Sequence, residues 1–473
     1  MNYKSILFFL GVFSSIVSLF SIFNILYAVY FDFIIDLNSY IITFFISIII
    51  GSSFCFIGKN HSKNISLSEQ IIFIVLAFIL IPMLISIPYY FSIYNINFLN
   101  SYFESVSGFT TTGFSIINNV KIIDEPLLLW RSSSQWLGGL LFLLATIGTI
   151  GSKQMKIKPS YLISGGASGR NFYNNFNFNF IKISVIYFFS SIGIIFLLTV
   201  VDIRLFDAFN LAFTIVSSGG FIPTNSLSNI IKSEFQIFIL SVCLLLPIFN
   251  FFILFDLITK KFKSINHQED LHLLILILLS TSLFYFFLNS NSSFSNIFFA
   301  ITSSISTSGI TIYKSNENSA FFFILLTIVG GSLISTSSGL KYTRIYILLK
   351  ISYQEIIKTV KPINIIDKNL FNREAKIEDQ DVKIAFFVFI SFILSIFILS
   401  SILSFDVLSY ESSFKLSILT LTNTLSSALY GLENVVFFDL NNFSKMSLIC
   451  FMFLGKIEVI TILFLISKFI FRE

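Results

Sequence analysis

The sequence contains, between two long apolar runs, the stretch Phe103-Glu104-Ser105-Val106-Ser107-Gly108-Phe109-Thr110-Thr111-Thr112-Gly113-Phe114. Weaker copies of it run from Phe213 to Phe221, from Phe299 to Ile310 and from Lys415 to Ala428. Each copy joins a helix-length segment to a strip rich in Ser and Thr that ends at a small residue. Four such units around one axis would form a ring of backbone carbonyls, which can replace the hydration shell of a monovalent cation.

The composition is that of a membrane protein. Of 473 residues, 55% are hydrophobic and 12% are charged, and the mean hydropathy is +0.87. A soluble fold of this length would need more polar surface, so we predict a polytopic helical membrane protein. The three cysteines lie in apolar runs and the three histidines lie in or beside basic loops, which predicts neither a disulfide framework nor a metal cluster.

Ten apolar runs are long enough to span a membrane, which predicts an all-α integral membrane fold. The predicted spans are roughly 5–31, 38–58, 69–93, 128–152, 180–201, 235–259, 271–289, 320–350, 383–404 and 443–470. The repeated stretch lies between spans three and four, five and six, seven and eight, and nine and ten. We therefore expect two lead helices (1–66) and four helix–pore loop–helix units in a pseudo-fourfold arrangement, over 67–158, 159–264, 265–360 and 361–473.

Basic residues divide unevenly between the two sides that ten spans define. With the N-terminus in the cytoplasm, 22 of the 30 Lys and Arg lie inside and 7 outside, while Lys456 lies within a span. Cytoplasmic loops carry the excess of Lys and Arg in membrane proteins. We therefore expect both termini in the cytoplasm, all four strips toward the outer side, and no nucleic-acid-binding domain. The inner loop at about 351–382 carries both signs of charge, and it fits either a solvated linker or a docking surface for a cytoplasmic partner.

The first copy has the pattern of a half-helix that stops within the membrane. Phe98, Phe103 and Phe109 belong to an apolar set at helical spacing, and the C-terminal end of such a helix directs partial negative charge toward a cation. Irregular backbone at membrane depth is tolerated only where protein buries it or where it lines a wet cavity. Gly113 permits an unusual backbone dihedral there. One such strip alone could be a helix-packing face or a turn, but four at equivalent places favour an ion pathway.

Several stretches resemble the Trk/Ktr/HKT superfamily of K⁺ transporters, and in particular its bacterial TrkH type. The likeness covers nearly the whole chain, including the two lead helices. Besides the first copy with Ser115, it lies in Trp130-Arg131-Ser132-Ser133-Ser134-Gln135-Trp136-Leu137-Gly138-Gly139, Gly330-Gly331-Ser332, Ser335-Thr336-Ser337-Ser338-Gly339-Leu340-Lys341 and Leu454-Gly455-Lys456-Ile457-Glu458. The resemblance implies a pseudo-fourfold pore with one filter residue per unit, a homodimer, and a separate cytoplasmic nucleotide-binding ring protein of the TrkA type.

Matching the family's motifs assigns the filter. The positions that would hold K⁺ are Gly113, Gly220, Gly309 and Ser426, and the wider filter set includes Thr111, Thr112, Ser218, Gly219, Ser308 and Leu425. The fourth position is a departure, because relatives usually carry Gly followed by Pro-Gly there; Gly431 is a second candidate. Ser at a filter position is associated with Na⁺ permeation in the superfamily. The alternative function is therefore a Na⁺-permeable or Na⁺-coupled cation transporter.

Span eight is interrupted by small and polar residues. Gly330, Gly331 and Gly339 bracket Ser335 and Ser338, and each Gly in a helix interior costs about 1 kcal/mol relative to Ala. In relatives the equivalent stretch is an intramembrane loop that obstructs the pore beneath the filter. We predict the same gate here, and a kinked, tightly packed helix is the alternative.

Two charged residues are predicted to lie near the ion pathway. Lys456 lies in the middle of span ten, where a charge costs about 2.5–3.5 kcal/mol on insertion scales. We predict that it repels cations below the filter as part of the gate; the alternative is a pair with Glu458, although residues two apart on a helix face different directions. Glu104 would either concentrate cations at the outer mouth or hydrogen-bond the pore helix.

The sequence thus predicts K⁺ uptake across the bacterial plasma (inner) membrane, driven by the membrane potential. K⁺ is the transported ion, and no bound cofactor is expected. The protein is not expected to be an enzyme, which would need His, Asp or Glu clustered at one depth in the spans. A substrate-coupled secondary transporter would instead predict two inverted repeats. The chain has no Gly-x-x-x-x-Gly-Lys-Ser/Thr run, so control by nucleotide would come from the partner.

Overall fold

The computed structural model describes residues 3–59, 67–92, 94, 96–150, 176–258, 267–288, 293–312, 317–360, 369–371, 377–406, 408–433 and 435–457. These residues form helices joined by short segments, with no β-strand among them, which confirms the predicted fold class. Six of the described helices are long and apolar enough to cross a membrane, and several shorter apolar helices accompany them. The six are α1 (Tyr3–Tyr30), α2 (Leu37–Gly58), α3 (Leu67–Phe91), α8 (Phe176–Val200), α13 (Gln268–Leu283) and α17 (Asp379–Ser404).

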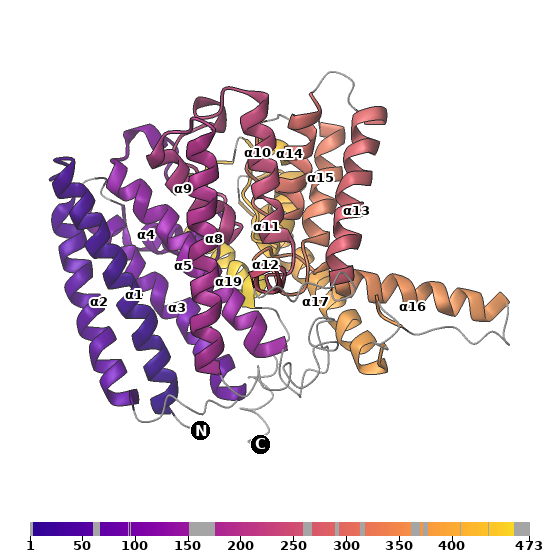
Figure 1. The fold of residues 1–473 in the computed structure, drawn as a ribbon, viewed down its shortest axis with the longest axis horizontal. Coiled ribbons are helices and arrows are strands. Elements are labelled where there is room, and N and C mark those ends of the chain that lie inside the picture. The colour runs from indigo at the N-terminus through magenta and orange to yellow at the C-terminus, as the bar shows by residue number, and fades with distance from the viewer. Residues whose placement is uncertain are drawn as a thin grey trace.

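The two lead helices α1 and α2 form an antiparallel pair at one side of the bundle (Figure 1). Glycine allows their close approach, because a Cβ placed on Gly11 would lie 2.8 Å from the carbonyl oxygen of Gly51. Helix α1 also packs on α3 and α5 (Glu125–Ile150) through the apolar side chains of Phe9, Phe13 and Val17. The lead pair is therefore part of the main apolar core.

Four short buried helices follow the pattern that the repeated stretch predicts. They are α4 (Phe98–Phe109), α9 (Leu205–Ser217), α14 (Phe294–Ile305) and α18 (Tyr410–Leu421). Each follows a longer helix along the chain and is itself followed by another helix. The following helices are α5, α10 (Glu234–Cys243), α15 (Glu317–Val329) and α19 (Asn442–Ile457). We call these four short elements the pore helices.

Two predicted spans are broken. The eighth is divided into α15 and α16 (Tyr342–Val360) by residues 330–341, which are not helical. The sixth, which the sequence analysis treated as continuous, consists of α10, α11 (Leu245–Ile248) and α12 (Phe252–Ile258). Helix α16 projects away from the bundle (Figure 1). The last predicted span is described as far as Ile457.

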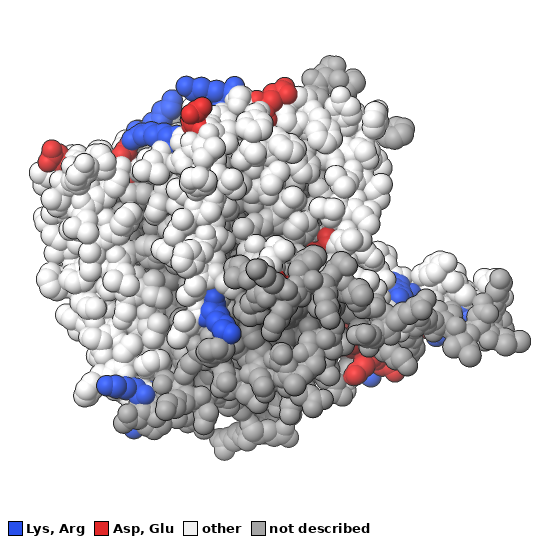
Figure 2. Space-filling model, in the orientation of Figure 1, with Lys and Arg blue, Asp and Glu red and all other residues white. Residues whose placement is uncertain are grey.

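The surface separates charge from apolar residues. In Figure 2, charged side chains gather along the upper edge and again in the lower part of the molecule, with a broad uncharged band over the helices between them. Large apolar side chains of the long helices are exposed, such as Phe45 and Ile49 of α2 at 55% and 63% and Phe196 of α8 at 65%. Such a surface suits the hydrocarbon region of a bilayer, and the protein is a multi-pass membrane protein.

Candidate functional site

Four strips with one backbone conformation follow the pore helices, and we number them 1 to 4 along the chain. Each bends at a residue with positive φ, a region that residues other than glycine enter uncommonly. These bend residues are Thr111 (59°), Ser218 (59°), Thr307 (60°) and Asn423 (47°). In strips 1, 3 and 4 the hydroxyl groups on either side of the bend pair with each other, namely Thr110 with Thr112, Ser306 with Ser308 and Thr422 with Thr424.

The shared bend fixes the register of the four strips. Two residues after it stand Gly113, Gly220, Gly309 and Leu425. Strips 1 to 4 are therefore residues 110–113, 217–220, 306–309 and 422–425. By this register Leu425, one residue before Ser426, aligns with Gly113, Gly220 and Gly309, and the assignment of Ser426 to the fourth filter position stays a prediction. Gly431 lies beyond a short 3₁₀ helix, Ala428–Tyr430, at the positive-φ turn that ends it.

The four strips converge and touch in ring order. A Cβ placed on Gly113 would lie 2.9 Å from Gly220 Cα, which joins strips 1 and 2. One placed on Gly220 would lie 2.9 Å from the Ser308 carbonyl oxygen of strip 3, and one on Gly309 would lie 2.7 Å from the Leu425 carbonyl oxygen of strip 4.

Strip 4 returns to strip 1, because Asn423 Nδ2 donates to Thr112 Oγ1 over 3.0 Å. The structure thus brings together every sequence-predicted member of strips 1 to 4 around one centre. Their ion-binding role stays a prediction.

Two helix glycines allow close packing against the ends of the pore helices, and the side-chain amide of Gln135 binds the backbone just after strip 2. A Cβ on Gly138 of α5 would lie only 1.7 Å from the Phe109 carbonyl oxygen, so α5 can touch the end of the first pore helix only because this residue has no side chain. Gly455 of α19 also approaches the end of the fourth pore helix closely, where a Cβ would be 2.4 Å from the Leu421 carbonyl oxygen. Gln135 Oε1 accepts hydrogen bonds from the Phe221 amide (3.3 Å) and Thr214 Oγ1 (3.2 Å) behind strip 2.

Glu104 is paired inside the protein. Its carboxylate accepts hydrogen bonds from the Ile116 amide (2.8 Å), Ser115 Oγ (3.0 Å) and Arg131 Nε (3.1 Å). Glu104 and Arg131 are 1% and 3% exposed, so this ion pair is buried. Arg131 also stacks over the Phe221 ring at 4.1 Å, which links unit 1 to unit 2. The partners of Glu104 thus belong to the segment after strip 1 and to α5, and not to the pore helix, so the buried carboxylate positions that segment, a role that was not predicted.

Residues 330–341, which the sequence predicts to lie within the membrane and which we call the intramembrane loop, contact strip 3 and the second pore helix. The Ser338 amide donates to Thr307 Oγ1 at the bend of strip 3 (2.9 Å). Thr336 Oγ1 donates to the Val216 carbonyl at the end of the second pore helix (2.9 Å). Because a pore helix ends just before its bend, these contacts place the loop against the helix-end side of the strips. Apart from half-buried Gly339, the loop is buried.

Lys456 joins this loop to strip 1. Its ammonium donates to Thr111 Oγ1 (2.6 Å) and to Ser338 Oγ (3.0 Å), and it lies 4.2 Å from the centre of the Phe142 ring. Lys341, within the loop, donates to the carbonyls of Ser335 (3.2 Å) and Ser337 (2.5 Å). Two buried ammonium groups therefore lie beside the loop. Glu458, the alternative partner of Lys456, lies outside the described residues.

The break in the sixth span supplies the loop with backbone partners. The Ser332 amide donates to the Ile248 carbonyl (2.8 Å), and the Phe251 amide donates to the Ile334 carbonyl (2.8 Å). This break was not predicted from the sequence. Pro247 and Asn250 are its signal, because proline interrupts a helix and Asn competes for backbone hydrogen bonds.

Acidic side chains hold the loop from the start of α13. Glu269 Oε1 accepts hydrogen bonds from the Leu333 amide (3.0 Å) and from Thr343 Oγ1.

A histidine lies between two aspartates near the start of α13. His267 Nε2 lies 3.1 Å from Asp256 Oδ2, and its Nδ1 lies 3.5 Å from Asp270 Oδ2. Burial lowers the pKa of His267, but the hydrogen bonds and charges of the two aspartates outweigh it, and the net pKa is raised. No group of three or more metal-ligating side chains occurs among the described residues.

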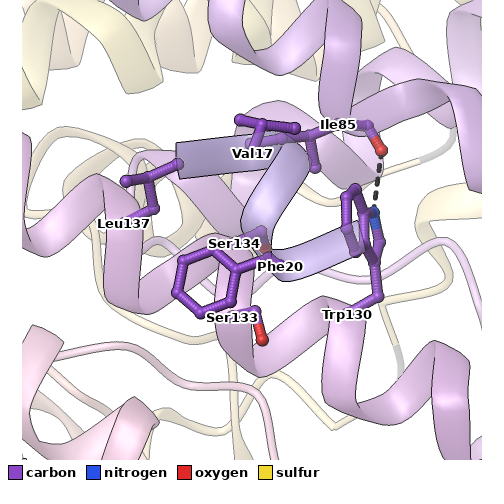
Figure 3. A pocket seen from close by; sticks show the side chains of 7 residues that line it. All are labelled: Val17, Phe20, Ile85, Trp130, Ser133, Ser134 and Leu137. Carbon is purple, nitrogen blue, oxygen red and sulfur yellow. Dashed lines mark hydrogen bonds between the residues drawn. The ribbon is translucent and has the colours of Figure 1, made fainter. Parts of the chain in front are cut away.

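A small pocket lies between α1, α3 and α5, and no strip residue lines it. Figure 3 shows Val17 and Phe20 facing Ile85 and Leu137, with Trp130 donating its indole N–H to the Ile85 carbonyl (3.0 Å). Ser133 and Ser134 complete the lining. The pocket is mostly apolar and offers a cation no ring of oxygens.

Comparison with known proteins agrees with this architecture. The sequence model of the TrkH family, described as "Cation transport protein", matches residues 36–288. An uncharacterized cation transporter of Methanocaldococcus jannaschii is 26% identical over 99% of this chain and 96% of its own length. The Trk system potassium uptake protein TrkH of Escherichia coli (strain K12) is 24% identical over 91% of this chain and 92% of its own length. The crystal structure of the potassium transporter TrkH from Vibrio parahaemolyticus has the same fold, with a TM-score of 0.81 at 20% identity over 98% of each chain.

Proposed function

The chain belongs to the TrkH family of cation transport proteins, and we propose that it carries K⁺ into the cell through the pore that strips 1 to 4 surround. It is a transporter and not an enzyme. Two of the curated relatives, which match 91% of this chain, are potassium uptake proteins. The observation that carries the proposal is the convergence of the four strips, because a desolvated alkali cation needs several oxygens at once.

The filter in this proposal consists of the predicted residues with one change of register. Thr111, Thr112, Ser218, Gly219 and Ser308 stay in it, and Gly113, Gly220, Gly309 and Leu425 form its narrowest ring. The pore helices support this assignment, since their C-terminal ends all meet the strips and carry partial negative charge.

The intramembrane loop is the proposed gate. Gly330, Gly331, Ser335, Ser338 and Gly339 belong to it, and Lys456 anchors it to strip 1. Its contact with strip 3, and its link to strip 1 through Lys456, support an obstruction beneath the filter. The ammonium of Lys456 adds an electrostatic barrier there, because a cation that passes it must approach a like charge.

The proposed membrane is the bacterial plasma membrane, with both termini in the cytoplasm. The excess of Lys and Arg on one side supports this orientation, 22 against 7. The membrane potential then drives uptake, at about 2.3 kcal/mol per charge for each 100 mV.

A homodimer and a cytoplasmic nucleotide-binding ring of the TrkA type are the proposed partners. Helix α16 supports an association, because it leaves the bundle and exposes apolar side chains along one face. These are Leu349, Tyr353, Ile356 and Val360, which are 63–73% exposed. Light scattering of the purified protein should give a dimer mass, and replacing Leu349, Tyr353 and Ile356 by Ser should shift it to the monomer.

The test of function is K⁺ uptake itself. The protein should restore growth of a K⁺-uptake-deficient bacterium at low external K⁺, and it should load proteoliposomes with ⁸⁶Rb⁺. Gly113→Ala should abolish both, since Gly113 has a φ of 86° and a Cβ there would meet Gly220 Cα at 2.9 Å. Gly193→Ala is the matched control, because a Cβ there meets nothing within 4 Å. Liposomes that take up ²²Na⁺ in preference to ⁸⁶Rb⁺ would establish the Na⁺-permeable alternative.

A further inference from the structure

Strip 4 differs from the other three at the narrowest ring. Gly113, Gly220 and Gly309 present only hydrogen toward their neighbours, whereas Leu425 brings an isobutyl group. The φ of Leu425 is not positive, unlike those of Gly113 (86°) and Gly309 (69°). A leucine is therefore sterically allowed at this position without backbone strain.

The Leu425 side chain reaches across the ring. Strips 1 and 2, 2 and 3, 3 and 4, and 4 and 1 are the touching pairs around it, so strips 2 and 4 face each other on a diagonal. A Cβ placed on Gly220 of strip 2 would nonetheless lie 2.5 Å from Leu425 Cβ and 3.2 Å from its Cγ. The Leu425 side chain thus packs against the Gly220 backbone of strip 2, between two strips that the predicted fourfold arrangement sets opposite each other.

An apolar group in this place opposes conduction in two ways. It removes oxygen contacts from one side of an ion that has already lost water, and burying an unpaired charge is costly. It also narrows the path with a surface that water does not wet, and apolar constrictions close channels by dewetting. Leu425 and the next three residues are half-buried, while the three ring glycines are buried. The leucine is therefore not fully enclosed by its neighbours.

We propose that Leu425 is an apolar stopper within the filter, which limits cation flux and must leave the ring for each ion to pass. This inference rests on the proposed transport function. It places a second restriction at the ring itself, separate from the intramembrane loop on the other side of the strips. The rate at which ions pass is then set by a side chain of strip 4, the one strip that lacks glycine.

The test compares side-chain size at position 425. ⁸⁶Rb⁺ uptake is measured in proteoliposomes for the wild type, Leu425→Gly, Leu425→Ala, Leu425→Ile and Leu425→Met, each first checked for a single symmetric peak in size-exclusion chromatography. Glycine and alanine should raise the initial rate by about tenfold or more, which corresponds to 1.4 kcal/mol or more of barrier. Isoleucine and methionine have similar bulk and should stay near the wild-type rate.

Two results would overturn the stopper. A wild type that conducts while Leu425→Gly is unchanged or slower would refute it and leave the transport function standing. Equal gains for glycine and for the bulky variants would refute it as well, because size would then not be the cause. If no variant, the wild type included, carries ⁸⁶Rb⁺ or ²²Na⁺ across the membrane, the transport function itself fails.

Discussion

Lys456 Nζ donates a 2.6 Å hydrogen bond to Thr111 Oγ1, and this bond joins the last described helix to the bend of strip 1. The same ammonium reaches Ser338 Oγ in the intramembrane loop. A single buried side chain thus ties together the element that would select ions and the element that would stop them. Removing its charge should act on both.

Lys456→Met should increase ⁸⁶Rb⁺ uptake. At an effective dielectric constant of 20, two unit charges about 4 Å apart repel by roughly 4 kcal/mol, so even partial screening leaves a rise of about tenfold. Proteoliposome flux measures the effect. Lys445→Met is the matched control on the same helix, because Lys445 bonds Asn100 and the Phe438 carbonyl and touches no strip. A loss of flux in folded Lys456→Met would contradict an electrostatic barrier.

Gly138→Ala should destabilise the folded protein. The added Cβ would lie 1.7 Å from the Phe109 carbonyl oxygen, so α5 or the first pore helix must move, and overpacking of this kind costs about 1–3 kcal/mol or more. The midpoint of thermal unfolding in detergent should fall, together with ⁸⁶Rb⁺ uptake. Gly193→Ala, in open space, should keep or slightly raise that midpoint. Equal midpoints for the two variants would argue against close helix contact at Gly138.

Arg131→Met should destabilise the protein by about 3–5 kcal/mol, because it leaves the buried Glu104 carboxylate without its counter-charge. Thermal unfolding of Arg131→Met, Glu104→Gln and the double variant measures the coupling. The double variant should be more stable than Arg131→Met alone, since no uncompensated charge then remains. Strictly additive losses would show that the two side chains do not depend on each other.

Asp124 should make stability depend on pH at the outer loop. Burial, followed by repulsion from Asp36, raises its pKa from 3.8 to about 6. The folded state therefore binds a proton more tightly than the unfolded state, so this group's contribution to stability is greatest at low pH and is lost as the pH rises from 3.8 to about 6. Asp124→Asn should unfold at a higher temperature than the wild type at pH 7.5, and the difference should vanish near pH 4. Unchanged profiles in Asp124→Asn would contradict the raised pKa.

Much of the fold follows from sequence pattern alone. Long apolar runs predict the spans, because a segment that crosses the bilayer must pair its own backbone N–H and C=O groups, and a helix does this within one segment. The interruption of span eight follows from the low helix propensity of its glycines. The pore helices follow from apolar spacing in short segments that end at Ser, Thr and Gly.

Contacts between distant segments could not be predicted in the same way. Arg131 as the partner of Glu104 depends on how α5 packs beside α4. The shift from Ser426 to Leu425 depends on where strip 4 bends, and a search for small residues leads to the serine instead. Asn423 is the signal that the sequence does offer, since Asn enters the positive-φ region more readily than most residues.

The broken sixth span has a consequence for how the four units depend on one another. At the break, the Ile248 carbonyl and the Phe251 amide have their hydrogen-bond partners in the intramembrane loop of the next unit. The same two bonds pair the Ser332 amide and the Ile334 carbonyl of that loop. Neither interruption would be stable in a lipid environment if the other were straightened into a helix. The second and third repeats are therefore no longer interchangeable copies, and a chimera that exchanges one without the other should assemble poorly even though each repeat keeps its own strip.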